Sequence, residues 1–482
     1  MTSKSHPTER PADSTRAARW TRWRADVLLG LVVLLLTAPV LQPLMDQQIS
    51  RYALTAALWD HQAVAIDAYE DLLGVDYAER GGMLYSDKAP GQPLLGVPAY
   101  GLYRAFGGDP ATQTATFADR GLWATTFVSA MLPAALLAVA MRRLAARVAP
   151  RRATHAALGL SVGTMLLPFG TVLFGHLLAA LLGVVAYLVL TAEPHARPWR
   201  LAAAGALAGA AVTVEYTTGI IAVAVTVTAL ALWRWQALWV VVGGAMPAIL
   251  LATYHTLAFG SPVQTGYHHN VFAKVTGQDE PTDSFLGVLP IEVLPDPGML
   301  LAVLAGERGL LVLTPIVAIG VVGLARLVPT SGAAQRDAIV GLSVLAAYVV
   351  LMSGWSNPTA GASPGPRYVV PALPFLAGGV AWLWQRAPAI GWLTAGIGAV
   401  TMGLATFTQP LVPRTTTALS EWAGRVADGQ TAQTWLTEST GTPWAIVVPI
   451  LAAAATTVWL LVGQPSGGSE AKAERASGPP RA

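Results

Sequence analysis

The sequence predicts an all-α polytopic membrane protein, and three observations support this fold class. The 482 residues are 54% hydrophobic and only 12% charged, whereas a soluble domain has about 25% charged residues. Apolar runs of about 20 residues, the length that crosses a bilayer as a helix, recur along nearly the whole chain. Arginines and acidic residues also gather in alternate loops, as membrane topology requires.

The apolar runs define the individual predicted helices. We expect about twelve spans, at residues 27–44, 121–141, 154–170, 172–193, 200–215, 217–233, 237–258, 309–328, 337–354, 367–385, 388–408 and 444–462. The run at 90–106 is ambiguous. If it crossed the membrane, the arginines of 142–152 would move to the outer side. We therefore interpret it as an outer-surface or re-entrant helix, and a thirteenth span would require one misassigned run elsewhere.

The charge distribution sets the orientation. With a cytoplasmic N-terminus, the inner loops carry Arg142, Arg143, Arg147, Arg151, Arg152, Arg197, Arg200, Arg234, Arg326, Arg336 and Arg386. The opposite loops, 45–120, 259–308, 355–366 and 409–443, hold most of the acids. We expect a multi-pass protein of the cell membrane with both termini cytoplasmic. Residues 1–26 and 463–482 are predicted to be disordered tails around a transmembrane domain at 27–462. The long first outer loop is expected to carry short surface helices.

Composition excludes several classes of site. The chain has no cysteine, which rules out disulfides, thiolate nucleophiles and cysteine-ligated metals. The net charge of +3 is small and not massed into a stripe, so no nucleic-acid partner is predicted. No Walker loop, HExxH, GxSxG or Rossmann fingerprint stands in a supporting context. The adjacent pair His268-His269 is a weak metal pattern, so no metal site is predicted and the cofactor is left open.

The segment Tyr85–Gly91, with sequence YSDKAPG, is the most informative stretch. It places an Asp-Lys pair in a Pro/Gly turn directly before an apolar run. Charges kept beside a bilayer are usually functional. Asp67 and Asp87 in this loop are candidates for a general base, and Lys88, Arg51 or Arg367 for phosphate binding. The alternative is an ordinary solvated acidic loop.

Six further polar residues are predicted at the depth of this loop. They lie at the outer ends of spans from distant parts of the sequence: His176, Glu215, Glu307, Arg308, Arg367 and Tyr368. Singly, each has a structural interpretation, such as a snorkelling arginine, a local ion pair or a histidine satisfied by a neighbouring helix. Their shared depth favours one outward-facing polar cavity.

These segments resemble the C-type superfamily of integral membrane glycosyltransferases, in particular the branch with protein O-mannosyltransferases and the aminoarabinose transferases of lipid A (family 39-like). The resemblance covers most of residues 27–385. It lies in Arg51-Tyr52, Tyr85–Gly91, Phe174-Gly175-His176, Val214-Glu215-Tyr216, Gly306–Leu310 and Gly365-Pro366-Arg367-Tyr368.

The resemblance implies an enzyme that transfers a sugar from a polyprenyl-phosphate donor to a glycan, lipid or protein of the cell envelope, on the extracytoplasmic side. It implies substrate contacts from Arg51, Tyr52, Tyr85, Lys88 and the six outer-end residues, with Lys88 and Arg367 on the lipid phosphate.

The chain departs from the family at the catalytic carboxylates. The branch carries an Asp-Glu pair where this sequence has Gln48 and Ile49. Asp46, two residues earlier, ranks first as the base, before Asp67 and Asp87. This departure leaves two other classes open: a transporter or flippase of lipid-linked sugar, or a non-catalytic envelope-assembly protein with a transferase-like fold. A transporter would show inverted repeats and mid-membrane charges, and no repeat is evident.

Overall fold

The computed structural model describes residues 11–45, 47–111, 119–193, 195, 197–272, 295–355, 357–413 and 415–462. Helices account for most of it. In the first half they are α1 (Pro11–Thr37), α2 (Gln47–Asp60), α3 (Gly91–Ala105), α4 (Arg120–Thr126), α5 (Leu132–Ala146), α6 (Ala153–Gly163), α7 (Leu166–Phe169), α8 (His176–Leu190), α9 (Pro198–Val214), α10 (Gly219–Trp233) and α11 (Leu238–Phe259).

The second half continues with α13 (Pro297–Ala305), α14 (Leu310–Leu313), α15 (Ile316–Leu327), α16 (Gly332–Ser353), α17 (Ala377–Arg386), α18 (Pro388–Phe407), α19 (Ala418–Ala427), α20 (Trp435–Thr440) and α21 (Val447–Val462). Short 3-10 segments include η1 (Asp67–Leu72), η6 (Gly266–His269) and η7 (Arg367–Leu376). The strands are β1 (Val40–Leu41), β2 (Ala78–Arg80), β3 (Met83–Tyr85) and β4 (Gln433–Thr434).

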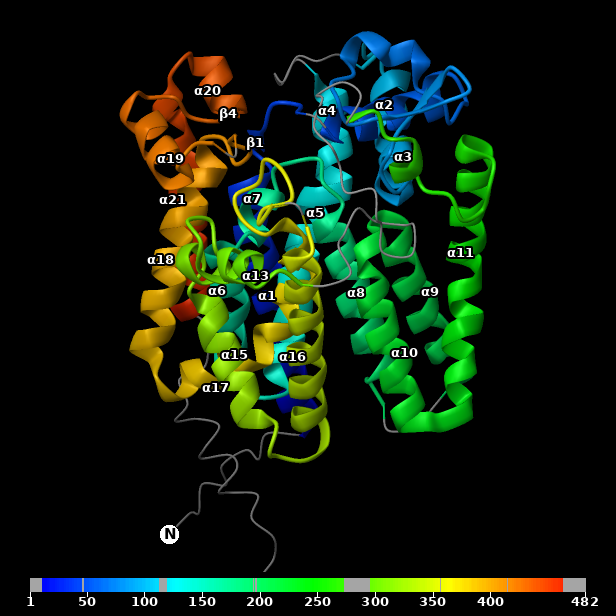
Figure 1. The fold of residues 1–482 in the computed structure, drawn as a ribbon. Coiled ribbons are helices and arrows are strands. Elements are labelled where there is room, and N and C mark those ends of the chain that lie inside the picture. The colour runs from blue at the N-terminus through cyan, green and yellow to red at the C-terminus, as the bar shows by residue number, and fades with distance from the viewer. Residues whose placement is uncertain are drawn as a thin grey trace, which may run out of the picture.

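The long helices form a bundle, and the short elements gather at one of its ends (Figure 1). Helices α8 to α11 stand on one side of the bundle, and α1, α6, α15 to α18 and α21 on the other. Helix α5 packs against α6 and α17 as well as α8, so it joins the two groups. We call the end that carries α2, α3, α19 and α20 the outer end, because it contains the predicted outer loops.

The two terminal helices run antiparallel. Helix α1 packs against α21, and the Arg24 guanidinium lies over the Trp459 ring at 4.6 Å from its centroid. Strand β1, which follows α1, pairs with β4, which precedes α21. The start of α1 and the end of α21 therefore lie at the same end of the bundle, as the sequence-based topology requires. Helix α1 begins at Pro11, within the predicted disordered tail, and ends at Thr37, before the predicted end of the first span.

The count of about twelve spans is not confirmed. Six helical segments in the described residues are long and apolar enough to cross a membrane: Arg120–Ala146, Tyr216–Phe259, Gly332–Ser353, Arg367–Arg386, Pro388–Phe407 and Pro443–Val462. A seventh arises if Pro297–Leu313 and Ile316–Leu327, bent by 97°, form one broken span. Several of the predicted spans are shorter helices in the structure, such as α6 with 11 residues and α8 with 15. Helix α3, at the ambiguous run, is not among these candidate spans and packs against α2 and α4.

Glycines bring α9 and α11 into close contact. A Cβ atom on Gly205 would lie 1.8 Å from the carbonyl oxygen of Val240, and one on Gly243 would lie 1.8 Å from that of Ala202. Gly209, one turn further along α9, lies against Gly244 and Pro247, further along α11 than Val240, so α9 and α11 are parallel. The stretch Tyr216–Phe259 therefore folds back on itself, and it turns near Arg234, whose φ is 52°. Small residues at such positions let membrane helices pack backbone to backbone.

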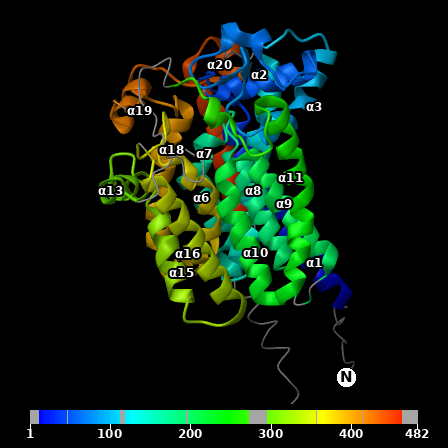
Figure 2. The same cartoon turned by 45° about the vertical axis from the view of Figure 1, so that its right-hand side comes forward.

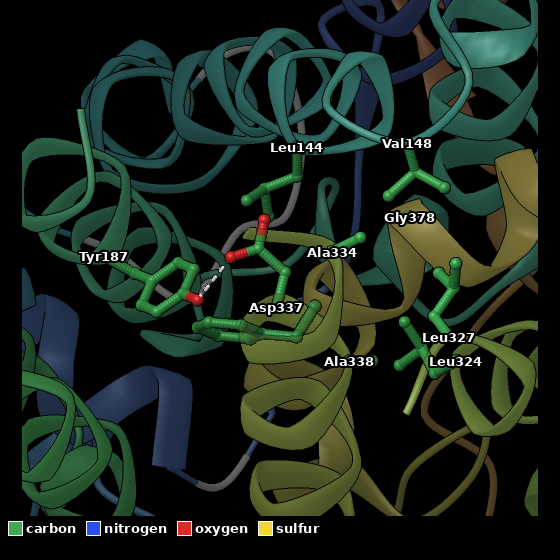
Figure 3. Close-up of a pocket in the computed structure, with 10 residues that line it drawn as sticks. Leu144, Val148, Tyr187, Leu324, Leu327, Ala334, Asp337, Ala338 and Gly378 are labelled. Atoms are coloured by element: carbon green, nitrogen blue, oxygen red, sulfur yellow. Dashed lines mark hydrogen bonds between the residues drawn. The ribbon is translucent and has the colours of Figure 1, made fainter. Parts of the chain in front are cut away.

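A polar network closes the bundle at the opposite end. Tyr187 donates a hydrogen bond to Asp337 at 2.6 Å, and the Arg147 guanidinium reaches the other carboxylate oxygen at 3.2 Å. Figure 3 shows Tyr187 and Asp337 beside a gap between α5, α8, α15, α16 and α17. This gap measures only about 10 Å³, the space of one water at most. It is a packing defect beside a structural ion pair and not a ligand site.

The first outer loop is a small folded unit built on Asp60. The Asp60 carboxylate accepts hydrogen bonds from the hydroxyls of Tyr69 and Tyr100, at 2.8 and 2.9 Å, and from Arg104 Nε at 2.9 Å. These contacts tie η1 and α3 to the end of α2. The β2–β3 hairpin pairs Ala78 with Tyr85 in antiparallel register. The expectation of short helices in this loop is confirmed.

The topology is testable because the chain has no native cysteine. We predict that Glu70→Cys, in η1 at the outer end, reacts with a membrane-impermeant maleimide in intact cells. Ser331→Cys, exposed between α15 and α16 at the opposite end, should react only after permeabilisation. Labelling in the reverse order would show that the orientation is inverted.

The contact between α9 and α11 predicts a stability effect. Gly243→Leu should push the helices apart and lower the melting temperature in detergent, with a cost of about 1–3 kcal/mol for overpacking. The matched control is Gly396→Leu in α18, where an added Cβ meets nothing within 4 Å. Equal melting temperatures for Gly243→Leu and the control would contradict the predicted packing.

Candidate functional site

Ionisable side chains from distant parts of the chain meet near the outer end of the bundle. They come from α2, the turn before α3, the start of α8, the residue after α9 and the start of η7. We call them the charge cluster: Arg51, Asp87, Lys88, His176, Glu215 and Arg367. Each is at least nine-tenths buried. The sequence predicted all of these residues as site candidates.

Arg51, Glu215 and His176 form one half of the charge cluster. Arg51 Nη2 lies 3.7 Å from Glu215 Oε2, and His176 Nδ1 lies 3.4 Å from the same oxygen. Arg51 Nη1 also donates to Gln92 Oε1 at 3.2 Å. Gly175 makes this approach feasible, because a Cβ there would lie 2.9 Å from the Val214 carbonyl oxygen. The Gly-His and Val-Glu segments of the sequence therefore meet each other.

Lys88 and Asp87 form the other half. Lys88 Nζ lies 2.5 Å from Asp87 Oδ2 and 3.4 Å from Asp76 Oδ1. Asn270 Nδ2 donates to the same Asp87 oxygen at 2.6 Å. Burial raises the pKa of the Asp87 carboxyl, and the charge of Lys88 opposes that rise. Burial lowers the pKa of Lys88, but the charges of Asp76 and Asp87 outweigh it and the pKa is raised, so Lys88 stays cationic.

Arg367 links the two halves. Its guanidinium lies 5.2 Å from the Tyr368 ring centroid and 5.9 Å from that of Phe174, and Phe174 stacks on His176. With its amide oriented to satisfy both partners, Gln47 accepts hydrogen bonds from Arg367 at 2.6 and 3.1 Å. Burial raises the pKa of the Glu215 carboxyl, and the charges of Arg51, Arg367 and Lys88 oppose that rise. The three cations therefore act on one volume.

The charge cluster has unused hydrogen-bonding capacity. Among the described residues, Arg51 Nε, Arg367 Nε, both ring nitrogens of His176 and Asp87 Oδ1 are buried without a hydrogen-bond partner. Such groups are rare in native proteins and each needs an explanation. Guanidinium and ammonium groups bind phosphate through charge-assisted hydrogen bonds. The arrangement is suited to an anionic group held between Arg51, Lys88 and Arg367.

Other predicted site residues have structural partners instead. The Tyr52 hydroxyl donates to Asp119 at 2.8 Å, and Asp119 caps α4. Tyr85 packs edge-on against Phe259 in the β2–β3 hairpin region. Asp67 accepts a hydrogen bond from the backbone N–H of Leu84 at 3.1 Å. Tyr368 is buried between Trp355 and His176, so it touches the charge cluster.

Glu307 and Arg308 have hydrogen-bond partners outside the charge cluster. The Arg308 guanidinium donates to four backbone carbonyls, those of Ser363, Val412, Pro413 and Thr416, at 2.6–3.2 Å. Glu307 accepts a hydrogen bond from the backbone N–H of Ala418. Arg308 thus joins two outer loops, and both of its terminal nitrogens donate to backbone carbonyls. Asp46 lies outside the described residues, and its neighbour in sequence, Gln47, contacts Arg367.

The sequence reasoning missed three polar neighbours of the charge cluster. Gln92 directly follows the YSDKAPG turn, Asn270 reaches Asp87 from beyond α11, and the Tyr267 ring lies 5.3 Å from Lys88 Nζ. None of these three residues belongs to a charged sequence pattern. Gln92 alone could have been found from the sequence, because it directly follows the turn. Within the described ranges, no group of three or more His, Asp or Glu residues is arranged to hold a metal ion.

Comparisons with known proteins found solved structures that are similar to this fold. No family model and no curated protein matches the chain. The crystal structure of ArnT from Cupriavidus metallidurans bound to undecaprenyl phosphate is similar, with a TM-score of 0.50, 14% identity, and coverage of 93% of this chain and 77% of that chain. The apo state gives a TM-score of 0.49 with 15% identity over the same shares.

A third solved structure is more distant. The apo form of the Archaeoglobus fulgidus oligosaccharyltransferase has a TM-score of 0.44 and 14% identity, and the match covers 86% of this chain but only 56% of that chain. The fold is therefore shown by the similarity to ArnT bound to undecaprenyl phosphate. The protein described here has a fold similar to that of ArnT, in line with the sequence resemblance to the branch that includes the aminoarabinose transferases of lipid A.

Proposed function

We propose that the protein is a membrane glycosyltransferase that takes a sugar from a polyprenyl-phosphate donor and transfers it to a cell-envelope acceptor on the extracytoplasmic side. The observation that carries this proposal is the convergence of three buried cations, Arg51, Lys88 and Arg367, two of which, Arg51 and Arg367, have an unsatisfied Nε donor. The fold supports it, because the similar ArnT structure was solved with undecaprenyl phosphate bound.

The proposed reaction is a displacement at the anomeric carbon. The acceptor hydroxyl oxygen bonds to that carbon, the bond from the carbon to the phosphate oxygen breaks, and its electron pair stays on the phosphate. The hydroxyl proton goes to a carboxylate base. Arg51, Lys88 and Arg367 stabilise the negative charge that develops on the leaving phosphate, and they do so in a site largely shielded from water.

The base is proposed from sequence position. Asp46 ranks first because it follows the first span and precedes Gln47, which contacts Arg367. Asp67 is engaged by the Leu84 backbone, and Asp87 is held by Lys88 and Asn270. Both engagements favour structural roles for these two carboxylates. Glu215 neutralises Arg51 and keeps it in place beside His176.

The phosphate site gives the first prediction for this function. Arg367→Gln and Lys88→Gln should each weaken binding of undecaprenyl phosphate to the purified protein about tenfold or more, because each removes a charge-assisted hydrogen bond. The control is Arg425→Gln, which removes a partly exposed charge from α19 at the same end of the molecule. Unchanged affinity in both cluster variants would refute the phosphate site.

The base gives the second prediction. Asp46→Asn should abolish transfer from labelled undecaprenyl-phosphate sugars to membrane extracts while undecaprenyl-phosphate binding is retained. Asp67→Asn and Asp87→Asn should act mainly through stability, measured as a lower melting temperature. Full activity in all three variants would mean that this loop does not supply the base. Donor binding without transfer in the unmodified protein would favour the transporter or assembly alternatives.

A further inference from the structure

The charges of the charge cluster are balanced before any ligand enters it. Three cations face three carboxylates there: Arg51, Lys88 and Arg367 against Asp76, Asp87 and Glu215. With a neutral His176, these formal charges sum to zero. A phosphate that binds the cations therefore adds a negative charge that the protein has not offset in advance. In a buried site of low dielectric, such an excess charge is costly.

Glu215 is the carboxylate with the weakest support. Asp87 accepts two hydrogen bonds on one oxygen, and the Asp76 side chain is 21% exposed to solvent. The Glu215 side chain is only 5% exposed, and its contacts are Arg51 Nη2 at 3.7 Å and His176 Nδ1 at 3.4 Å. Neither ring nitrogen of His176 has a hydrogen-bond partner among the described residues. Glu215 is therefore held in its ionised form by nearby charge rather than by hydrogen bonds.

We call His176 and Glu215 the His–Glu pair, and it lies where the first outer loop meets the bundle. Figure 2 shows α8 and α9, which lead to the two residues, packed together below α2 and α3. The charged and titratable groups around the pair are Arg51 from α2, Lys88 from the turn before α3, Arg367 from η7, and the hydroxyls of Tyr216 in η4 (Tyr216–Thr218), Tyr267 in η6 and Tyr348 in α16. The hydroxyls are neutral, so the three cations keep the carboxylate ionised.

A bound phosphate would compete with Glu215 for these cations. Arg51 and Arg367 each have an Nε without a partner among the described residues. Phosphate oxygens bind guanidinium groups through short, charge-assisted hydrogen bonds, whereas Glu215 stands 3.7 Å from Arg51. Burial raises the pKa of the Glu215 carboxyl, and the charges of Arg51, Arg367 and Lys88 oppose that rise. Once a phosphate neutralises the cations, burial is no longer opposed, and a proton on the His–Glu pair becomes favourable.

We infer that the His–Glu pair is a proton-binding site, which takes up one proton when a phosphate group binds to Arg51 and Arg367. This inference rests on the proposed function for the assignment of the charge cluster as a phosphate site, and it adds a coupled proton to that site. The two residues are in contact, so the proton belongs to the pair rather than to either residue alone. Because binding takes up a proton, the affinity for phosphate falls as the pH rises, by up to about tenfold per pH unit.

Calorimetry with a phosphodiester tests the proton uptake. Dodecyl methyl phosphate keeps a single negative charge at neutral pH, so a proton that leaves the solution on binding goes to the protein. Titration of the purified protein at about pH 7 in MOPS and in Tris, buffers with different heats of ionisation, gives the number of protons from the difference in the measured heats. We expect about one proton per bound phosphodiester in the unmodified protein, and a weaker affinity at about pH 8 than at about pH 6.

Glu215→Gln isolates the pair, because it keeps the size of the side chain and removes its charge. Arg51 is then no longer neutralised, so this variant should bind the phosphodiester at least as tightly as the unmodified protein, without proton uptake. The matched control is Glu421→Gln, which removes a carboxylate paired with Arg425 in α19 at the same end of the molecule. The control should still take up about one proton.

The outcomes separate this inference from the proposed function. Phosphodiester binding without proton uptake in the unmodified protein overturns the inference and leaves the phosphate site intact, and this result does not depend on the folding of a variant. Proton uptake that persists in Glu215→Gln overturns it as well, because the proton then binds elsewhere. A protein that does not bind the phosphodiester lacks both the phosphate site and the coupled proton. Proton-coupled binding in a protein that transfers no sugar refutes the transferase and supports the inference.

Discussion

The burial of three cations in one small volume is the constraint on which the rest of this structure depends. Arg51, Lys88 and Arg367 repel one another in a medium of low dielectric, and each has lost most of its hydration. Carboxylates between them offset that cost: Glu215 faces Arg51, and Asp87 and Asp76 face Lys88. Removing one partner of such a pair leaves an uncompensated buried charge, a loss of about 3–5 kcal/mol.

This constraint fixes the outer unit on the bundle. The cations come from α2, the turn before α3 and the start of η7, whereas Glu215 follows α9. Charge pairing therefore requires the first outer loop to sit on the ends of α8, α9 and η7. Glycines allow the approach, since a Cβ on Gly91 would lie 2.7 Å from the Thr213 backbone and one on Gly266 would lie 2.4 Å from Asp87 Cα. The ion pairs and the close backbone contacts therefore fix the same position of the first outer loop on the bundle.

The sequence predicted the membrane class, the outer polar site and five of its elements, because charges in an apolar chain are sparse and their depth follows from helix ends. It was less successful with features that depend on three-dimensional neighbours. Arg308 resembled a ligand for substrate, yet its four carbonyl partners come from loops 55 to 108 residues further along the chain. The runs at α6, α7 and α8 resembled full spans, but glycines and polar residues break them into shorter helices. Asn270, which donates to Asp87, could not be predicted, because an amide side chain indicates a site only when its partners are known.

The charge cluster and the surroundings of Arg308 differ in how the hydrogen-bond donors of their cations are used. In the charge cluster, cationic groups retain unsatisfied donors, and such donors favour a phosphate. Around Arg308, both terminal nitrogens of the cation donate to backbone carbonyls, so this cation holds loops together. The loop 357–367 contacts both regions, because the Ser363 carbonyl accepts from Arg308 and a Cβ on Gly361 would lie 2.9 Å from Arg367 Nη1. Arg367, one of the cations proposed to hold the phosphate, is therefore positioned by the same loop that Arg308 anchors, and a change at Arg308 should reach the charge cluster through this loop.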